Sequence, residues 1–127
     1  MMNLKKAIAA SALAIMFTLA LSACGSSSTT MNANISEPSE AAAELVIHAR
    51  NWEFDKEEYR VKKGEAVKIA VESDSGFHGV KIKDTSFDIK SNESKILSFD
   101  VAGTYDIYCN IACGTGHTRM KAKIIVE

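Results

Sequence analysis

Residues 103–126 read GTYDIYCNIACGTGHTRMKAKIIV. Runs of β-favouring residues at 104–108 and from 121 onward flank a central segment, residues 109–120, which contains two glycines. Strand-forming runs separated by a glycine-containing segment predict two neighbouring strands joined by a loop. The loop carries four side chains with metal-binding chemistry, namely Cys109, Cys113, His117 and Met120.

The pattern of short strands extends back to about residue 44. Apolar residues alternate with polar or smaller ones in 45–50 and again in 67–72, as half-buried strands require. Turn-forming residues separate the runs, at 63–64, 74–76, 91–92 and 102–103. About seven or eight short strands with this spacing predict an all-β domain, either a sandwich or a barrel.

The side chains of the loop form a soft ligand set of thiolate, imidazole and thioether. Such ligands select copper over magnesium, calcium or manganese. A structural zinc site usually has paired Cys-x-x-Cys spacing, and a mononuclear blue copper site needs a single cysteine. Two cysteines, two histidines and a methionine instead suit two copper ions bridged by two thiolates. A structural disulfide between Cys109 and Cys113 remains open, because exported proteins often contain one.

The spacing Cys-x-x-x-Cys-Gly-x-x-His-x-x-Met resembles the CuA signature of cytochrome c oxidase subunit II, which the copper domain of nitrous oxide reductase shares. The likeness covers residues 45–127 and includes Gly-Thr-Tyr-x-x-Tyr-Cys at 103–109. The resemblance implies a Greek-key cupredoxin β-sandwich and a binuclear copper centre. The second histidine of that family matches His78, within Ser-Gly-Phe-His-Gly-Val at 75–80.

Carried over to this chain, the resemblance assigns a role to each candidate ligand. Cys109 and Cys113 would bridge the two coppers, and His78 and His117 would bind one copper each. Met120 would be a weak axial ligand, with the backbone carbonyl of Ile111 opposite to it.

The chain departs from that family at two positions and resembles it at one more. The oxidase subunit usually has an acidic residue between the cysteines that also holds magnesium; this chain has Ile111, so we expect no magnesium. A transmembrane hairpin of the oxidase subunit is replaced here by a lipid-attachment motif ending at Cys24. Trp52 resembles an aromatic position that assists electron entry, although packing is the favoured interpretation of a single tryptophan.

The first 23 residues predict a lipoprotein signal peptide. Lys5 and Lys6 precede an apolar segment at 7–20, which is too short for a typical membrane span. The following Leu-Ser-Ala-Cys at 21–24 resembles the bacterial lipoprotein cleavage box, which makes Cys24 the lipidated residue; a retained anchor helix is the alternative. We therefore expect a lipid-anchored flexible tether at 24–43 and a folded domain at 44–127, on the extracytoplasmic face of the membrane.

Composition and motif together limit the function. A formal net charge of −1 gives no basic patch of the kind that nucleic acid requires. The pattern contains no nucleophile or general base apart from the metal ligands, so we expect no autonomous catalysis. The favoured function is electron transfer between a c-type cytochrome donor and an oxidase or reductase acceptor. Copper delivery for oxidase assembly and a metal-free structural domain are the alternatives.

Overall fold

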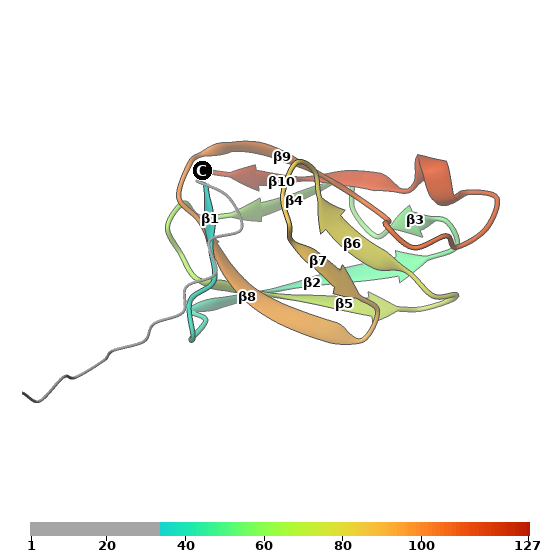
Figure 1. The fold of residues 1–127 in the computed structure, drawn as a ribbon, viewed down its shortest axis with the longest axis horizontal. Coiled ribbons are helices and arrows are strands. Elements are labelled where there is room, and N and C mark those ends of the chain that lie inside the picture. Colours follow the sequence, from blue (N-terminus) through green and yellow to red (C-terminus); the bar gives the residue numbers. More distant parts are fainter. Residues whose placement is uncertain (1–33) are drawn as a thin grey trace, which may run out of the picture.

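A computed structural model describes residues 34–127, which form two five-stranded β-sheets packed against each other (Figure 1). One sheet has the order β1-β8-β5-β2-β3 and the other has the order β4-β10-β9-β6-β7. The predicted all-β sandwich is confirmed. In chain order the elements are β1 (Ile35–Ser36), β2 (Ala43–Arg50), β3 (Glu53–Phe54), β4 (Glu58–Val61), β5 (Val67–Ser73), β6 (Gly79–Ile82), β7 (Asp88–Lys90), β8 (Glu93–Phe99), β9 (Gly103–Tyr108), the 3₁₀ turn η1 (His117–Arg119) and β10 (Lys121–Val126).

Alternating apolar residues from both sheets fill the space between them. In β5 the side chains of Val67, Ile69 and Val71 are buried, as the alternation in the sequence predicts. The buried apolar residues of the two sheets form one contiguous cluster, which includes Cys109 and Met120. The loop between β9 and β10 is therefore attached directly to the core of the sandwich.

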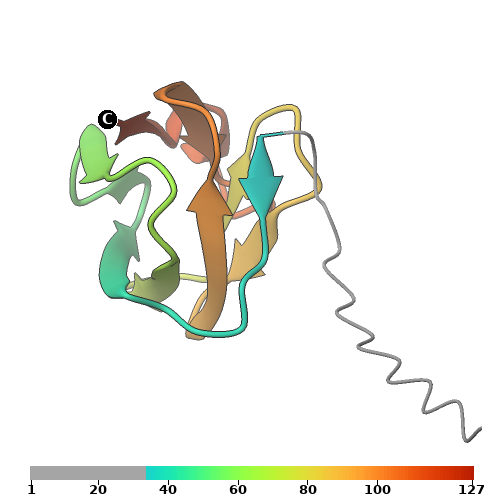
Figure 2. The same cartoon turned by 90° about the vertical axis from the view of Figure 1, so that its left-hand side faces the viewer.

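The folded domain begins earlier than the sequence pattern indicates. The pattern places residues 24–43 in a tether, whereas Ile35 and Ser36 form β1 and pair antiparallel with Phe99 and Ser98 of β8 (Figure 2). The Ile35 side chain is completely buried. A two-residue strand has no alternation to detect, and its partner β8 lies more than 60 residues away, so only the folded structure reveals the pairing. The predicted signal peptide and Cys24 lie outside the described residues.

Three loops meet at the end of the sandwich opposite the C-terminus (Figure 1). β2 and β5 are parallel neighbours, with Ala49 opposite Ser73, so the segments that follow them emerge at the same end. The β9–β10 connection reaches this end as well, because Tyr108 and Lys121 are paired at its base. Within residues 34–127, no helix has the length and apolar character needed to cross a membrane.

The segment between β2 and β4 is organised by the Asp55 carboxylate. It accepts hydrogen bonds from the backbone N–H of His48 (3.0 Å) and from the hydroxyl of Tyr59 (2.6 Å). Burial acts to raise the pKa of Asp55, but these hydrogen bonds and the nearby charge of Lys56 outweigh it, and the net pKa lies below the ordinary value of 3.8. Asp55 thus connects β2, which precedes Trp52 in the chain, with β4, which follows it.

Replacing Asp55 with asparagine is expected to destabilise the domain by about 1 kcal/mol at pH 7, because hydrogen bonds to a charged, partly exposed acceptor are lost. A carboxyl whose pKa is lowered on folding contributes stability above its unfolded value, and the contribution is lost as the pH falls through the lowered pKa. The difference between the two proteins in urea denaturation should therefore shrink below pH 3.8. Glu57→Gln removes the same charge from the same segment and should leave stability unchanged; an equal loss there would contradict the assignment.

Candidate metal centre

The loop between β9 and β10 holds the candidate ligands at the end of the sandwich. Its base is closed by a hydrogen bond from the N–H of Cys109 to the carbonyl of Met120 (3.1 Å). The turn η1 follows, in which the N–H groups of His117 and Arg119 donate to the carbonyls of Gly114 (3.2 Å) and Gly116 (3.0 Å). Backbone hydrogen bonds therefore fix the shape of the loop independently of its side chains.

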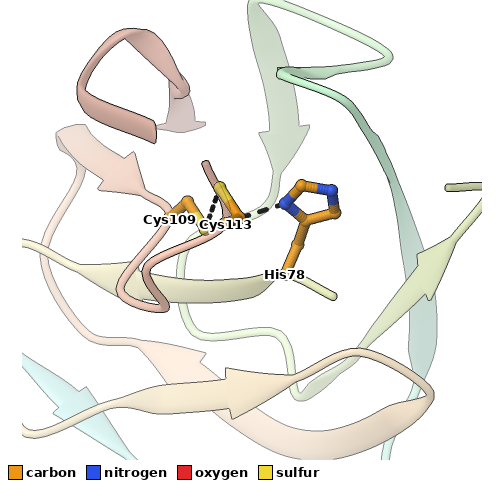
Figure 3. Close-up of side chains that lie close together, drawn as sticks. All are labelled: His78, Cys109 and Cys113. Atoms are coloured by element: carbon orange, nitrogen blue, oxygen red, sulfur yellow. Dashed lines mark hydrogen bonds between the residues drawn. The ribbon is translucent and has the colours of Figure 1, made fainter. Parts of the chain in front are cut away.

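Two sulfur atoms form the centre of the site. The Sγ atoms of Cys109 and Cys113 lie 3.7 Å apart as free thiols, and they point toward each other (Figure 3). The carbonyl oxygen of Ile111 lies 3.3 Å from the Cys109 sulfur. Burial raises the pKa of the Cys113 thiol, and the adjacent Cys109 sulfur raises it further. Two thiolates at this distance repel each other, and a cation between them would remove the repulsion.

His78 reaches the sulfur pair from the segment before β6. Its ring is completely buried, and Nδ1 lies 3.9 Å from the Cys109 sulfur. On the other side of the ring, Nε2 lies 2.8 Å from the carbonyl of Ser75 and 3.1 Å from Oδ1 of Asn51. A backbone carbonyl only accepts hydrogen bonds, so Nε2 carries the proton and the Nδ1 lone pair faces the sulfur. The ring is thus oriented as a ligand through Nδ1.

The backbone of His78 is held as firmly as its ring. Its N–H donates to Oγ of Ser91 (2.9 Å), while the Ser91 hydroxyl and N–H both donate to the His78 carbonyl (2.6 and 2.9 Å). Gly76 leaves room for the contact between the ring and Asn51, since a Cβ atom at this position would clash with the Asn51 side chain. These contacts correspond to the outer-shell support that histidine ligands of metals normally have.

His117 and Met120 occupy the second half of the loop. Nδ1 of His117 lies 3.6 Å from the Cys113 sulfur, so this histidine approaches the outer sulfur while His78 approaches the inner one. The His117 ring is half-buried, whereas the Met120 side chain is buried in the core. The ligand atoms of His78, Cys109 and Cys113 all lie within 4.8 Å of one another. His117 is adjacent to this group through Cys113.

Trp52 packs against the loop that carries Cys113 and His117. Its Nε1–H donates to the carbonyl of Cys113 (2.8 Å). A Cβ atom added to Gly114 would lie 3.0 Å from that nitrogen, and one added to Gly116 would clash with the Trp52 side chain. The indole therefore packs against both glycines. The packing interpretation of Trp52 is supported by these contacts, which lie directly against the candidate ligands.

Replacing Gly116 with alanine is expected to displace the loop or the indole. The backbone of Gly116 has φ −93°, a conformation that other residues adopt, but a Cβ atom there would clash with the Trp52 side chain. Overpacking of this kind costs about 1–3 kcal/mol. Urea denaturation should show this loss, and bound copper should have an altered absorption spectrum. Thr118→Ala, at an exposed position two residues away, serves as the control. Wild-type stability in Gly116→Ala would show that the loop is not confined by Trp52.

The donor atoms fit a soft metal ion. Two thiols and two imidazole Nδ1 atoms converge from two separate loops, and a carbonyl oxygen adjoins them. Among residues 34–127, the group of donor atoms at this site contains no carboxylate, the ligand type that hard cations prefer. Thiolate and imidazole ligands together suit soft or borderline ions such as copper and zinc.

No family model matches the chain, and no curated protein matches it. Among solved structures, a chain of a heme-copper terminal oxidase dimer is 30% identical with a TM-score of 0.59, and the match covers 67% of this chain and 65% of that one. This chain thus spans somewhat less than two thirds of that protein chain.

Two further structures have the same fold. The periplasmic domain of subunit II of cytochrome oxidase from Bradyrhizobium japonicum is 14% identical with a TM-score of 0.63, over 69% of this chain and 86% of that one. A reduced amicyanin variant is 23% identical with a TM-score of 0.53, over 74% and 99%. Residues 34–127 therefore have the cupredoxin fold, carry a His-Cys-Cys candidate metal site and are similar in fold to the periplasmic domain of cytochrome oxidase subunit II.

Proposed function

We propose that this chain is an electron-transfer protein with a binuclear copper centre of the CuA type. The observation that carries the proposal is the row of donor atoms from His78 Nδ1 to Cys109 Sγ, Cys113 Sγ and His117 Nδ1, with successive separations of 3.9, 3.7 and 3.6 Å. Two sulfurs with one histidine on either side suit a pair of metal ions, because each ion would share both sulfurs and have its own imidazole. A single ion could bind both histidines only if the donors moved closer together, because His117 does not belong to the group whose ligand atoms all lie within 4.8 Å of one another.

The proposed ligand set contains side chains and one backbone group. Cys109 and Cys113 would bridge the metals, and each of His78 and His117 would bind one. The carbonyl of Ile111, 3.3 Å from the Cys109 sulfur, and the thioether of Met120 would be weak additional ligands. A bound copper pair would accept and release one electron.

The protein's contribution to such a reaction is rigidity. An electron carrier must change charge with little rearrangement of its ligands. Here the inner cysteine is buried, the His78 ring is fixed on both sides, and the Trp52 indole holds the outer cysteine at its carbonyl. Because the ligands are held by the fold, either redox state would find them in nearly the same place.

The remaining parts of the proposal concern location and partners. The similarity to oxidase subunit II supports an extracytoplasmic site of action in association with an oxidase. We propose further that residues 1–23 are a lipoprotein signal peptide and that Cys24 bears the lipid anchor. The tether between anchor and domain would then end at about β1, since Ile35 is already part of the fold. A c-type cytochrome would donate electrons, and an oxidase or reductase would accept them.

Copper titration of the purified protein tests the proposal. Uptake of two tightly held coppers, with a seven-line mixed-valence paramagnetic signal, is the expected result, since one electron shared equally by two copper nuclei gives that pattern. One labile cuprous ion would instead indicate copper delivery. No copper uptake together with loss of both free thiols would indicate a structural disulfide between Cys109 and Cys113.

A further inference from the structure

The His78 ring has one more hydrogen-bond acceptor than its orientation requires. Its Nε2 lies 2.8 Å from the carbonyl oxygen of Ser75 and 3.1 Å from Oδ1 of Asn51. The Ser75 carbonyl belongs to the backbone, three residues before the histidine, and it is sufficient to fix which ring nitrogen carries the proton. The Asn51 oxygen is a side-chain atom and comes from the segment after β2. The second acceptor therefore depends on which residue occupies position 51.

Asn51 is held beside the ring by contacts of its own. Its backbone N–H donates to Oγ of Ser75 (3.1 Å). Gly76 leaves the space that Oδ1 occupies, because a Cβ atom there would clash with this oxygen and would also lie 2.9 Å from Nε2 of His78. The backbone and the neighbouring glycine therefore place the side chain at position 51 in the same way whether it ends in an amide or in a carboxylate.

The surroundings of Asn51 are compatible with either group. Asn51 is exposed as a residue, although its Oδ1 contacts a completely buried ring. A charged group on an exposed residue keeps part of its hydration, so burial does not exclude an aspartate here. The adjacent cation, Arg50, pairs with Glu53 (2.8 Å). An amide and a carboxylate of equal size thus both suit the fold, and the difference between them is the charge.

The charge of this acceptor is transmitted through the imidazole. An acceptor on one ring nitrogen makes the opposite nitrogen a stronger donor to a metal ion. A carboxylate does so more than an amide, because a charge-assisted hydrogen bond is roughly twice as strong as a neutral one. Stronger donation and a nearby negative charge both favour the metal state with the higher positive charge, which is the oxidised state. His117 provides a contrast: within residues 34–127, its ring contacts the Cys113 sulfur through Nδ1, and its Nε2 has no protein acceptor.

We infer that Asn51 is a positioning residue that keeps the reduction potential of the metal centre high by giving the His78 ring a neutral second acceptor. This inference rests on the proposed electron-transfer function. Reduction of the centre takes one electron from a one-electron donor, which becomes oxidised, and no bond forms or breaks and no proton moves. Asn51 acts through His78 alone, so its effect falls on one side of the site.

The contact is tested first in the metal-free full chain under reducing conditions. Proton–nitrogen NMR of histidine-labelled protein observes the Nε2–H proton of His78. Asn51→Asp should move this signal downfield, since its hydrogen bond becomes charge-assisted, and Asn51→Ala should move it upfield, since an acceptor is lost. Asn92→Asp is the matched control, because it makes the same isosteric change at an exposed residue whose φ of 66° aspartate also adopts. An unchanged signal in both Asn51 variants would overturn the inference.

The effect on the potential is tested next by redox titration of the copper-loaded chain. Asn51→Asp should raise the ratio of oxidised to reduced protein at a fixed electrode potential by about tenfold, which is a midpoint lower by about 59 mV for one electron. Asn51→Ala should change this ratio in the opposite direction by about threefold, so the inference stays testable if the aspartate variant does not fold. Asn92→Asp should change the ratio by less than about twofold, because solvent and salt screen an exposed charge.

The second histidine provides an internal reference. In proton NMR of the oxidised, paramagnetic protein, Asn51→Asp should move the ring signals of His78 and leave those of His117 in place. Equal potential shifts in Asn51→Asp and Asn92→Asp, or equal movement of both histidines, would indicate a general charge effect and overturn the inference. Unchanged potentials in both Asn51 variants would overturn it as well. Failure of the unmodified chain to load copper would refute the proposed function and the inference with it, whereas the metal-free His78 signal would still report the contact.

Discussion

Cys113→Ser is expected to reduce copper uptake from two ions per chain to at most one and to eliminate the mixed-valence signal. The Cys113 sulfur lies between the Cys109 sulfur, 3.7 Å away, and Nδ1 of His117, 3.6 Å away. A serine hydroxyl does not ionise at neutral pH and is a poor ligand for copper, so the bridge and the link to His117 would be lost together. Copper analysis and paramagnetic resonance on the purified variant give the measurement.

The fold should survive this substitution, which makes the result interpretable. Cys113 is half-buried on the loop, and the hydrogen bond that it forms with Trp52 uses its backbone carbonyl. Cys24→Ser provides a matched control, since it makes the same change at the cysteine that the sequence assigns to lipid attachment. A normal seven-line signal in Cys113→Ser would disprove the bridging assignment. Loss of the signal in Cys24→Ser would show that the signal does not depend specifically on Cys113.

A strand was predictable wherever it is long enough for apolar and polar side chains to alternate visibly along it. Residues 67–73 carry three apolar side chains at every second position, and all three are buried in β5. The segment at 51–58 shows no such period, and it forms the short β3 and the start of β4. β3 is stabilised by antiparallel pairing with the preceding strand β2, and β4 by parallel pairing with β10, which is distant in the sequence. Short strands of this kind are decided by tertiary pairing, which a local pattern cannot contain.

The candidate ligands that lie close together in the sequence were easier to predict than the ligand that lies far from them. Cys109 and Cys113 are four residues apart in one loop, so their spacing alone indicates a common site. The structure brings His78 to them from 31 residues upstream, and the sequence offered only a match to a family position as a clue. Which of these atoms bind metal stays a prediction, since the geometry brings the donors together without identifying the ion.

The residues that support the ligands were not predictable from the sequence. Asn51 and Ser75 orient the His78 ring, and Trp52 holds the carbonyl of a cysteine 61 residues away. Asparagine and serine are common in loops, and none of the three residues has a spacing that connects it with a histidine or cysteine. Their function depends on β2 and β5 ending side by side, which is a property of the sheet order. Supporting residues of a metal site thus become visible only after the topology is known.

The two histidines should respond differently to removal, because they differ in burial. His78→Gly and His117→Gly are each expected to eliminate the two-copper signal. Addition of imidazole should restore it in His117→Gly, where the missing ring is half-buried at the surface and free imidazole can enter. In His78→Gly the vacated space is closed to solvent and lined by acceptors, so imidazole should restore little or nothing. Paramagnetic resonance at increasing imidazole concentration measures both recoveries.

Stability without metal separates the same two positions. Removal of the His78 ring leaves a cavity in the core and deprives the Ser75 carbonyl and the Asn51 side chain of a donor, so the metal-free domain should lose about 3 kcal/mol. Removal of the His117 ring, which is half-buried on a loop, should cost the metal-free domain less than about 1 kcal/mol. Urea denaturation under reducing conditions provides both values. Equal destabilisation and equal rescue by imidazole would mean that the two histidines are equally accessible. That result would contradict the assignment of His78 to the buried Cys109 sulfur and of His117 to the outer Cys113 sulfur.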